Sequence, residues 1–306
     1  MHFVQSKTIL NRNGMNIYRG CSHGCIYCDS RSKCYHFDHE FEDIEVKQNA
    51  PELLIEALRK KRKKCMIGTG SMTDPYIPLE KELCLTRRCL EIIDRYDFGA
   101  AVLTKSDLVL RDLDILERIN RKSRAVVQMT LTTADDQLCR KIEPGVCPTS
   151  RRFEVLCECR DRGIPTAVWL SPFLPFINDT QENIDALLDY CVRAGVQAVL
   201  CFGIGLTLRE GNREYFYSAL DRFSRENNES NESNESNGPE KLQLSGLKER
   251  YIRTFGESYI VSSPNHNTLM RRISEVCRTN NILLGTDSVF KWLQEFPEDK
   301  LQPSLF

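Results

Sequence analysis

From Met15 onward, the chain alternates short runs of apolar, often β-branched residues with longer segments whose apolar positions recur at helical spacing. Runs such as CMIGTG, GAAVLTKS and AVVQMTLTT are typical of buried strands, and APELLIEALRKKRKK and LTRRCLEIIDRY are typical of connecting helices. Strands that alternate with helices favour a parallel sheet. Six such units follow one another as far as Phe223, fewer than the eight of a complete barrel. The pattern therefore predicts an α/β fold, a partial (β/α)6 TIM-like barrel over residues 15–223, with an open doubly wound sheet as the alternative.

Three segments lie outside this pattern. Residues 1–14 form a short N-terminal extension. The stretch RENNESNESNESNGPEK contains no apolar residue, so residues 224–245 are expected to be a disordered surface insertion. Residues 246–306 contain the helix-like sequences GLKERYIRTFG and HNTLMRRISEVCRTNNILL. They predict a helical C-terminal extension that packs on the core or closes its open side.

Composition restricts the partners and the compartment. With 306 residues and 41% hydrophobic content, the chain is long enough to bury a large core. Its net charge of −1 gives no overall field for nucleic acid, which would have to bind at a local patch. No apolar run approaches the length of a membrane span, and Met1 to Leu10 lacks the apolar block of a signal peptide, so no membrane partner is expected. Fourteen cysteines in such a chain favour a reducing, cytoplasmic location.

The densest cysteine cluster lies in the sequence RGCSHGCIYCDS, which places Cys21, Cys25 and Cys28 within eight residues. Gly20 and Gly24 allow the loop to curl, so that the three sulfur atoms converge. Thiolates are soft ligands that bind zinc or iron–sulfur clusters. The sequence therefore predicts a metal centre here.

The kind of metal centre depends on a fourth ligand. A structural zinc site needs four protein ligands, and His23 or Cys34 would have to complete it. An iron–sulfur cube held by three cysteines instead keeps one iron open for chemistry. The spacing alone leaves both interpretations open.

The cluster motif resembles that of the radical S-adenosylmethionine (SAM) superfamily. The pattern Cys-x3-Cys-x-aromatic-Cys, with Tyr27 as the aromatic residue, follows the first predicted strand of the barrel. The sequences GTGSMTDPYIPLE, LTKSDLVLRD, TADDQLCRKIEP and GIPTAVWLSPFLPFIND resemble the branch related to spore photoproduct lyase. The resemblance spans about residues 15–223. It implies a [4Fe–4S] cluster held by Cys21, Cys25 and Cys28, SAM as cofactor, and an electron donor such as flavodoxin or ferredoxin.

The resemblance also implies where SAM binds. Ligands of such barrels lie at the C-terminal ends of the strands, so polar strand ends are the candidates. The expected contacts are the methionine ammonium with the end of the second strand and a nearby carboxylate, the cofactor carboxylate with a lysine, the ribose with two threonines, and the adenine with a tyrosine. In that order the residues are Gly68, Thr69, Gly70, Asp74, Lys105, Thr130, Thr132 and Tyr27.

The predicted function is reductive cleavage of SAM, followed by hydrogen abstraction from an unidentified substrate that the resemblance relates to nucleic acid. Spore photoproduct lyase repairs a thymine adduct in DNA and uses a cysteine beyond its second strand as hydrogen donor. The corresponding sequence GTGSMTDPY contains no cysteine, which argues against that reaction. Cys201 is the candidate substitute, with a buried packing role as the alternative. The competing hypothesis for the whole chain is a non-catalytic, zinc-stabilised nucleic-acid-binding protein.

Overall fold

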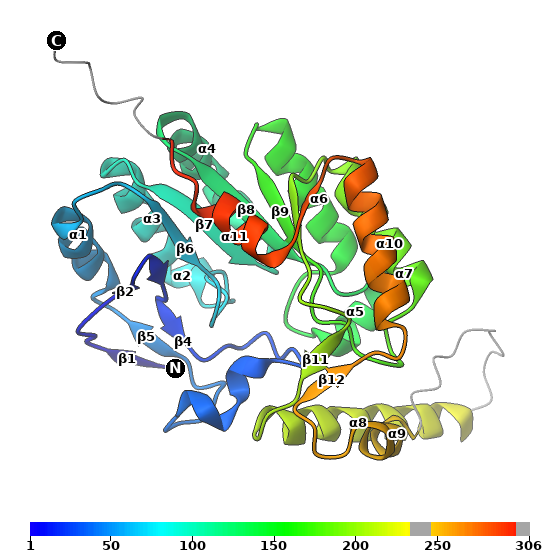
Figure 1. Cartoon of the computed structure of the whole chain (residues 1–306). Helices are drawn as coiled ribbons and strands as arrows, with labels where there is room; N and C mark the ends of the chain where they lie inside the picture. Colours follow the sequence, from blue (N-terminus) through cyan, green and yellow to red (C-terminus); the bar gives the residue numbers. More distant parts are fainter. Residues whose placement is uncertain (233–245, 298–306) are drawn as a thin grey trace, which may run out of the picture.

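The computed structural model describes residues 1–232 and 246–297, and its centre is an eight-stranded sheet flanked by helices (Figure 1). Every neighbouring pair of strands in this sheet is parallel except the pair at one edge. In spatial order the strands are β13 (Leu283–Leu284), β10 (Ala198–Leu200), β9 (Thr166–Trp169), β8 (Ala125–Thr130), β7 (Gly99–Thr104), β6 (Met66–Thr69), β3 (Gly14–Met15) and β2 (Leu10–Asn11).

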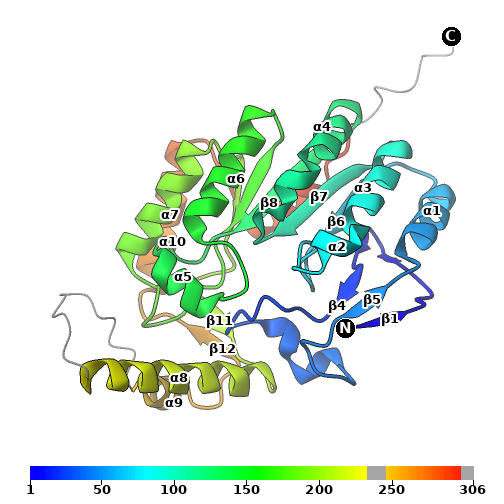
Figure 2. The same cartoon turned by 180° about the vertical axis from the view of Figure 1, so that it is seen from behind.

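The order of the strands confirms the predicted partial barrel. Strands β3, β6, β7, β8, β9 and β10 are the six predicted strands, and they neighbour one another in the order of the sequence. The connecting helices pack on the outer face of the sheet, as Figure 2 shows for α1, α3, α4 and α6. These outer helices are α1 (Ala50–Lys60), α3 (Leu85–Arg95), α4 (Leu113–Lys122), α6 (Thr149–Asp161) and α7 (Gln181–Arg193).

The outer helices form because their apolar positions recur on one face. In α1, Pro51 lies in the first turn, where its missing N–H costs no helical hydrogen bond, and Leu54 and Leu58 are buried. Glu52 near its start and Lys60 near its end complement the helix dipole. The helix thus presents one apolar face to the sheet and leaves its basic end in solvent.

The inner face of the barrel is filled by a helix that the sequence did not reveal. Helix α11 (Thr286–Gln294) lies on the face of the sheet opposite α3 and α4 (Figures 1 and 2). Its Val289 and Leu293 pack against residues of five strands, which are Met66, Ala101, Val126, Ala167, Ala198 and Leu200. Because three of these residues are alanines, the sheet has room for a helix inside the barrel.

The C-terminal extension contains strands as well as the predicted helices. It contributes α9 (Leu247–Phe255) and α10 (His266–Thr279) as expected, and also the edge strand β13 and the strand β12 (Ile260–Ser262). Strand β12 pairs antiparallel with β11 (Gly205–Thr207). The extension thus widens the sheet and covers its inner face.

The remaining elements surround the strand ends. Strands β1 (His2–Val4), β5 (Glu45–Lys47) and β4 (Tyr18–Arg19) form a second, three-stranded sheet. Residues 1–14 are thus partly ordered strands, because β1 joins this sheet and β2 joins the main one. The other helices are η1 (Asp29–Arg31), η2 (Lys33–Tyr35), η3 (Asp107–Asp112), α2 (Glu80–Leu83), α5 (Asp136–Ile142) and α8 (Asn212–Glu232).

The predicted disordered insertion is shorter than expected at its N-terminal side. Helix α8 continues through Glu232, so residues 224–232 are helical in the structure. Extending a helix that is already nucleated requires little free energy even in a polar sequence. Residues 233–245 lie outside the described residues. Within 1–232 and 246–297, every helix is too short or too polar to cross a membrane.

Candidate active site

The cysteine loop runs from the end of β4 into η1 and is held by backbone hydrogen bonds. Gly20 and Gly24 adopt φ values of 87° and 66°, which L-residues rarely adopt, so the predicted curl depends on both glycines. The Cys21 N–H donates to the Phe41 carbonyl at 3.1 Å, and the Ile26 N–H donates to the Ile142 carbonyl at 3.0 Å. Hydrogen bonds to two other segments of the chain, at Phe41 and Ile142, thus fix the shape of the loop.

The three thiols are free and differ in exposure. Cys25 is buried, whereas Cys21 and Cys28 are partly exposed. Burial raises the pKa of Cys21 to about 12 and also raises that of Cys25. Both residues are therefore protonated near neutral pH unless a bound metal stabilises the thiolates.

Among the described residues, the three thiols are not part of a closed set of four zinc ligands. Zinc holds thiolates at about 2.3 Å, which places the sulfur atoms about 3.8 Å apart. Over the described residues, the three sulfur atoms do not form a group within 4.8 Å of one another, alone or with a fourth ligand. His23 instead faces Asp74, with 3.6 Å between Nδ1 and Oδ2, and Cys34 is exposed on η2. Neither residue completes a set of four zinc ligands in this arrangement, which favours a cluster held by three thiols.

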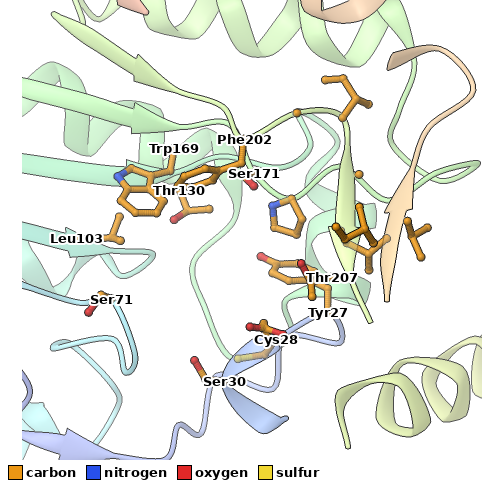
Figure 3. Close-up of a pocket in the computed structure, with 18 of the residues that line it drawn as sticks. Tyr27, Cys28, Ser30, Ser71, Leu103, Thr130, Trp169, Ser171, Phe202 and Thr207 are labelled. Carbon is orange, nitrogen blue, oxygen red and sulfur yellow. The ribbon is translucent and has the colours of Figure 1, made fainter. Parts of the chain in front are cut away.

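A cavity of about 420 Å³ lies beside this loop, at the C-terminal ends of β6 to β10. Five residues predicted from the sequence line it: Tyr27, Cys28, Gly70, Lys105 and Thr130. Figure 3 labels Tyr27, Cys28 and Thr130. The structure thus brings a cluster cysteine and four predicted SAM contacts to one cavity.

The other predicted residues do not line this cavity. Gly68 and Thr69 lie within β6, and of the three predicted residues Gly68, Thr69 and Gly70, only Gly70 lines the cavity. Thr132 is fully buried, and its hydroxyl finds no hydrogen-bond partner in the described part of the chain. Cys21 and Cys25 do not line the cavity either.

Asp74 supports the site from outside the cavity. One carboxylate oxygen accepts the Thr104 hydroxyl at 2.7 Å and the Tyr76 N–H at 2.8 Å. The other accepts the Lys105 N–H at 2.7 Å. Because both oxygens already accept protein donors, the geometry makes Asp74 a residue that positions Lys105.

Lys105 lines the cavity, and its ammonium forms no salt bridge in the described part of the chain. Its Nζ lies 6.0 Å from the centre of the Tyr27 ring and donates no hydrogen bond to any residue in 1–232 or 246–297. Burial alone would lower the pKa of Lys105, but the Glu143 and Asp74 carboxylates raise it, as does Cys25 when it is a thiolate. The cavity therefore contains a permanent positive charge that suits a carboxylate ligand.

A buried ion pair beneath the loop was missed by the sequence analysis. Glu143 and Arg152 are fully buried, with 2.6 Å between Oε2 and Nη2. Glu143 also accepts the Tyr27 hydroxyl, and Arg152 donates to the Thr130 carbonyl at 2.9 Å. The pair thus links the cysteine loop to the end of β8. The spacing of Glu143 and Arg152 in the sequence does not predict this ion pair, because the packing of α5 and α6 brings the two residues together.

Aromatic side chains form the wall of the cavity near α11. Trp169 donates from its indole nitrogen to Gln128 at 2.9 Å, which fixes its ring. Phe202 packs edge-on against Trp169 at 5.5 Å between ring centres (Figure 3). Phe290 of α11 contacts both rings. Phe202 remains 55% exposed. The wall thus offers an accessible aromatic surface beside the polar end of the cavity.

The C-terminal extension supplies another part of the wall. His266, the first residue of α10, lines the cavity and accepts the Ile204 N–H on Nδ1 at 3.2 Å. Its other ring nitrogen therefore carries the hydrogen in the neutral ring. The helical spacing of HNTLM predicts α10, but it does not show that this histidine reaches a site built from the strands.

Cys201, the predicted hydrogen donor, lies outside the cavity lining. Its sulfur is 3.7 Å from the Met270 sulfur of α10 and 3.7 Å from the Gly203 carbonyl. The next residues, Phe202 and Gly203, line the cavity instead. The thiol therefore occupies the packed layer between β10 and α10, which is the alternative role considered for it.

Cys28 of the cysteine loop and residues at the ends of β6 to β10 thus line one cavity. The model of the Radical SAM superfamily matches residues 15–191, more than half of the chain. The chain therefore belongs to the radical SAM superfamily, as its cysteine motif indicated. Members of this superfamily use a [4Fe–4S] cluster and SAM and require a reductant.

Similar proteins support the same family and fold. The uncharacterised protein Rv2578c of Mycobacterium tuberculosis is 30% identical over 72% of this chain and 69% of its own length. The uncharacterised protein MJ0683 of Methanocaldococcus jannaschii is 33% identical over 56% of this chain and 63% of its own. A spore photoproduct lyase complexed with dinucleoside spore photoproduct superposes with a TM-score of 0.58 at 12% identity, covering 92% of this chain and 80% of the other. That likeness shows the fold.

Proposed function

We propose that Cys21, Cys25 and Cys28 hold the [4Fe–4S] cluster and that SAM binds in the cavity beside Cys28. The donor set fits the cluster, because three free thiols share one loop while His23, a candidate fourth ligand for zinc, faces Asp74. Among the described residues, no fourth ligand joins them, so one iron is left for the cofactor. This arrangement opposes the zinc-stabilised binding protein, which needs a closed set of four ligands.

The residues that line the cavity support the following proposed contacts with SAM. The Lys105 ammonium pairs with the cofactor carboxylate, and the exposed backbone at Gly70 receives the methionine ammonium. Thr130 and Tyr27 also line the cavity, and in this proposal they contact the ribose and the adenine respectively. Gly68, Thr69, Asp74 and Thr132 act from behind this surface by holding the ends of β6, β7 and β8 in place.

When bound and reduced by a donor such as flavodoxin or ferredoxin, the cluster and SAM supply a 5′-deoxyadenosyl radical that abstracts hydrogen from the substrate. The protein's own part is to exclude water and fix geometry. The hydrogen bonds of Asp74 hold the Lys105 backbone, and the Glu143–Arg152 pair holds Tyr27 and the end of β8. The apolar packing around α11 closes the barrel on the side away from the cysteine loop.

We propose that the substrate is related to nucleic acid. Trp169 and Phe202 present ring surfaces at the cavity, and stacking on aromatic side chains is a general way to bind nucleobases. A spore photoproduct lyase of the same fold has been solved with SAM and a dinucleoside spore photoproduct. The lack of a cysteine between Gly68 and Tyr76 and the packed position of Cys201 oppose the same thymine-adduct repair.

The observation that carries the proposal is the unpaired Lys105 ammonium in the cavity that Cys28 lines. Anaerobically purified protein should be brown, contain about four irons and four sulfides per chain, and form 5′-deoxyadenosine from SAM under strong reductant. Cys25→Ala should abolish the colour and the product. Cys34→Ala, which removes an exposed thiol outside the trio, should preserve both.

Two results would contradict this proposal. One is colourless protein that, after iron reconstitution, retains a full equivalent of zinc that Cys25→Ala lacks. The other is equal 5′-deoxyadenosine formation by Cys25→Ala and the unmodified protein. The substrate class has a separate readout. Deuterium from labelled oligonucleotides or nucleosides should enter 5′-deoxyadenosine, and its absence with every nucleic acid tested would reject that class while leaving SAM cleavage intact.

A further inference from the structure

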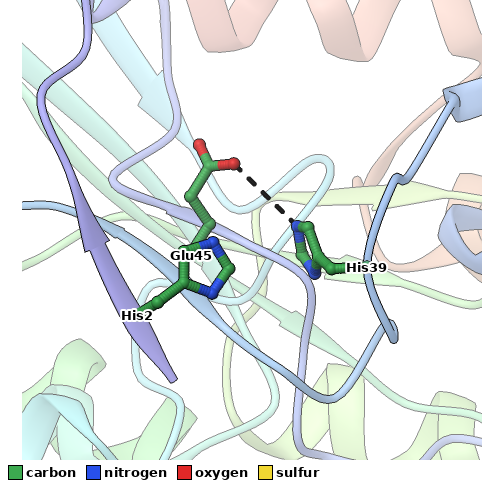
Figure 4. Close-up of side chains that lie close together, drawn as sticks. All are labelled: His2, His39 and Glu45. Carbon is green, nitrogen blue, oxygen red and sulfur yellow. Dashed lines mark ion pairs between the residues drawn. The ribbon is translucent and has the colours of Figure 1, made fainter.

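A second group of metal-binding side chains lies away from the cysteine loop. His2 of β1, His39 and Glu45 of β5 each offer a ligand atom, and these three atoms all lie within 4.8 Å of one another (Figure 4). The His39 Nε2 and the Glu45 Oε2 are 3.9 Å apart. In the described residues, no other set of three or more histidine, cysteine or carboxylate groups is this close.

Hydrogen bonds orient both imidazole rings. The His2 Nδ1 lies 3.0 Å from an Asp43 carboxylate oxygen, and the His39 Nδ1 lies 2.9 Å from the Glu40 carbonyl oxygen. Because both partners can only accept, each Nδ1 carries the hydrogen, and each Nε2 of a neutral ring keeps its lone pair. Metal-binding histidines in proteins are typically held in this way by a carboxylate or a carbonyl.

One ligand atom in the group lacks a hydrogen-bond partner. The His39 Nε2 is buried and makes no hydrogen bond within the described parts of the chain. A buried polar atom without a partner costs free energy, so its position needs an explanation. A cation between this nitrogen, the His2 ring and the Glu45 carboxylate would satisfy it.

We propose that His2, His39 and Glu45 bind a divalent transition-metal ion, with Zn²⁺ as the probe. Two imidazoles and one carboxylate suit zinc and its neighbours in the first transition series rather than Ca²⁺ or Mg²⁺, which prefer oxygen ligands. Zinc holds such ligands about 3.4 Å apart, so rotations of partly exposed side chains close the site. Water fills the fourth position.

Arg19 is the cation that competes for this carboxylate. Its Nη1 lies 3.7 Å from the Glu45 Oε2. Its Nη2 donates to the carbonyls of Tyr35 and His36, and its guanidinium lies over the Phe37 ring at 4.7 Å. The arginine thus has other partners and can release Glu45 to a metal ion.

The location of the site gives it a structural consequence. A bound ion would tie β1 to β5 and to the segment between η2 and β5. That segment contains Phe41, whose carbonyl accepts the Cys21 N–H. The ion would therefore stabilise the wall of the cysteine loop without entering the reaction, and its binding does not depend on the proposed function.

The test is zinc content of the full chain, beginning at Met1 without an affinity tag. After equilibration with Zn²⁺ and removal of free ion, the unmodified protein should retain a full equivalent more than His39→Gln, measured by mass spectrometry of the metal. This difference is independent of zinc bound by the cysteines. Glu45→Gln should also lose the extra equivalent, and Asp43→Asn should weaken zinc binding by about 10- to 100-fold.

His36→Asn is the matched control, because His36 is exposed in the same segment and its left-handed backbone tolerates asparagine. It should keep the full zinc content. Zinc should also raise the melting temperature of the unmodified protein and of His36→Asn, but not that of His39→Gln. Equal zinc content in the unmodified protein and His39→Gln, with both folded by circular dichroism, would overturn the proposal.

Discussion

The two ends of the barrel interior are built by the same strands but filled in opposite ways. Toward the start of the strands, alanines of β7, β9 and β10 make room for Val289 and Leu293 of α11. Toward their ends, the same layer of strands leads to Lys105, Thr130 and Trp169 around an open cavity. The comparison teaches that small apolar residues in these strands make room for the packing of α11, while polar and aromatic residues at their ends line a cavity. Substitutions at the two ends should therefore separate stability from cofactor affinity.

The largest effect is expected at the ion pair that supports the polar end. Glu143→Ala leaves the buried Arg152 guanidinium without its carboxylate, which should lower the free energy of unfolding by about 3–5 kcal/mol. Urea unfolding measures this loss. Asp189→Ala is the control, because it removes an exposed ion pair with Arg193 and should cost less than about 1 kcal/mol. Similar losses for the two variants would contradict the role assigned to the buried pair.

A loss of stability without a change in cofactor binding is expected at the apolar end. Leu293→Ala removes a buried side chain from the contact between α11 and the sheet and should destabilise the protein by about 3 kcal/mol. The dissociation constant of SAM, measured by calorimetry below the melting range, should stay unchanged. Val192→Ala, at an exposed apolar position on α7, should change neither quantity. A large loss of SAM affinity in Leu293→Ala would break the separation between the two ends.

The opposite result is expected at Lys105. Lys105→Met keeps the apolar stem but removes the ammonium that faces the cavity, and a charge-assisted hydrogen bond contributes about 1.5–3 kcal/mol. The dissociation constant of SAM should rise about 10- to 100-fold, with little change in the urea midpoint. Lys81→Met on the surface of α2 is the control for loss of one positive charge. Unchanged affinity in Lys105→Met would exclude the proposed pairing with the cofactor carboxylate.

The smallest effect concerns acid stability. Burial alone would raise the pKa of Glu143, but Arg152 and Lys105 lower it below its ordinary value of 4.5. Because the folded pKa is depressed, this stabilisation is complete above the unfolded pKa and is lost as the pH falls through the folded pKa. The melting temperature of the unmodified protein should therefore fall more steeply below about pH 5 than that of Glu143→Gln. Parallel acid limbs for the two proteins would show that another group dominates.

Much of this architecture was predictable because it depends on local patterns. Six apolar runs at regular spacing predict the six central strands, and the glycines in the cysteine loop predict its positive φ values. The spacing of Cys21, Cys25 and Cys28 likewise identified the family. These signals lie within a few residues of one another and do not require knowledge of the packed structure.

The features that could not be predicted depend on distant partners. Asp74 is an expected cofactor contact, but Tyr76, Thr104 and Lys105 use both of its oxygens. His266 reaches the cavity only because the extension packs beside β10. The spacing of residues along the sequence does not predict these contacts, because they form between elements that meet only in the folded structure.

The small residues on the inner face of the sheet also affect how the chain folds during synthesis. The strands that carry Ala101, Ala167 and Ala198 leave the ribosome well before α11, with residues 201–285 still to be made. Until Val289 and Leu293 emerge, the inner face of the sheet is not covered by α11, the helix that packs on it in the finished protein. Nascent chains halted near residue 280 should therefore bind hydrophobic dyes and chaperones more strongly than chains long enough to expose α11 fully.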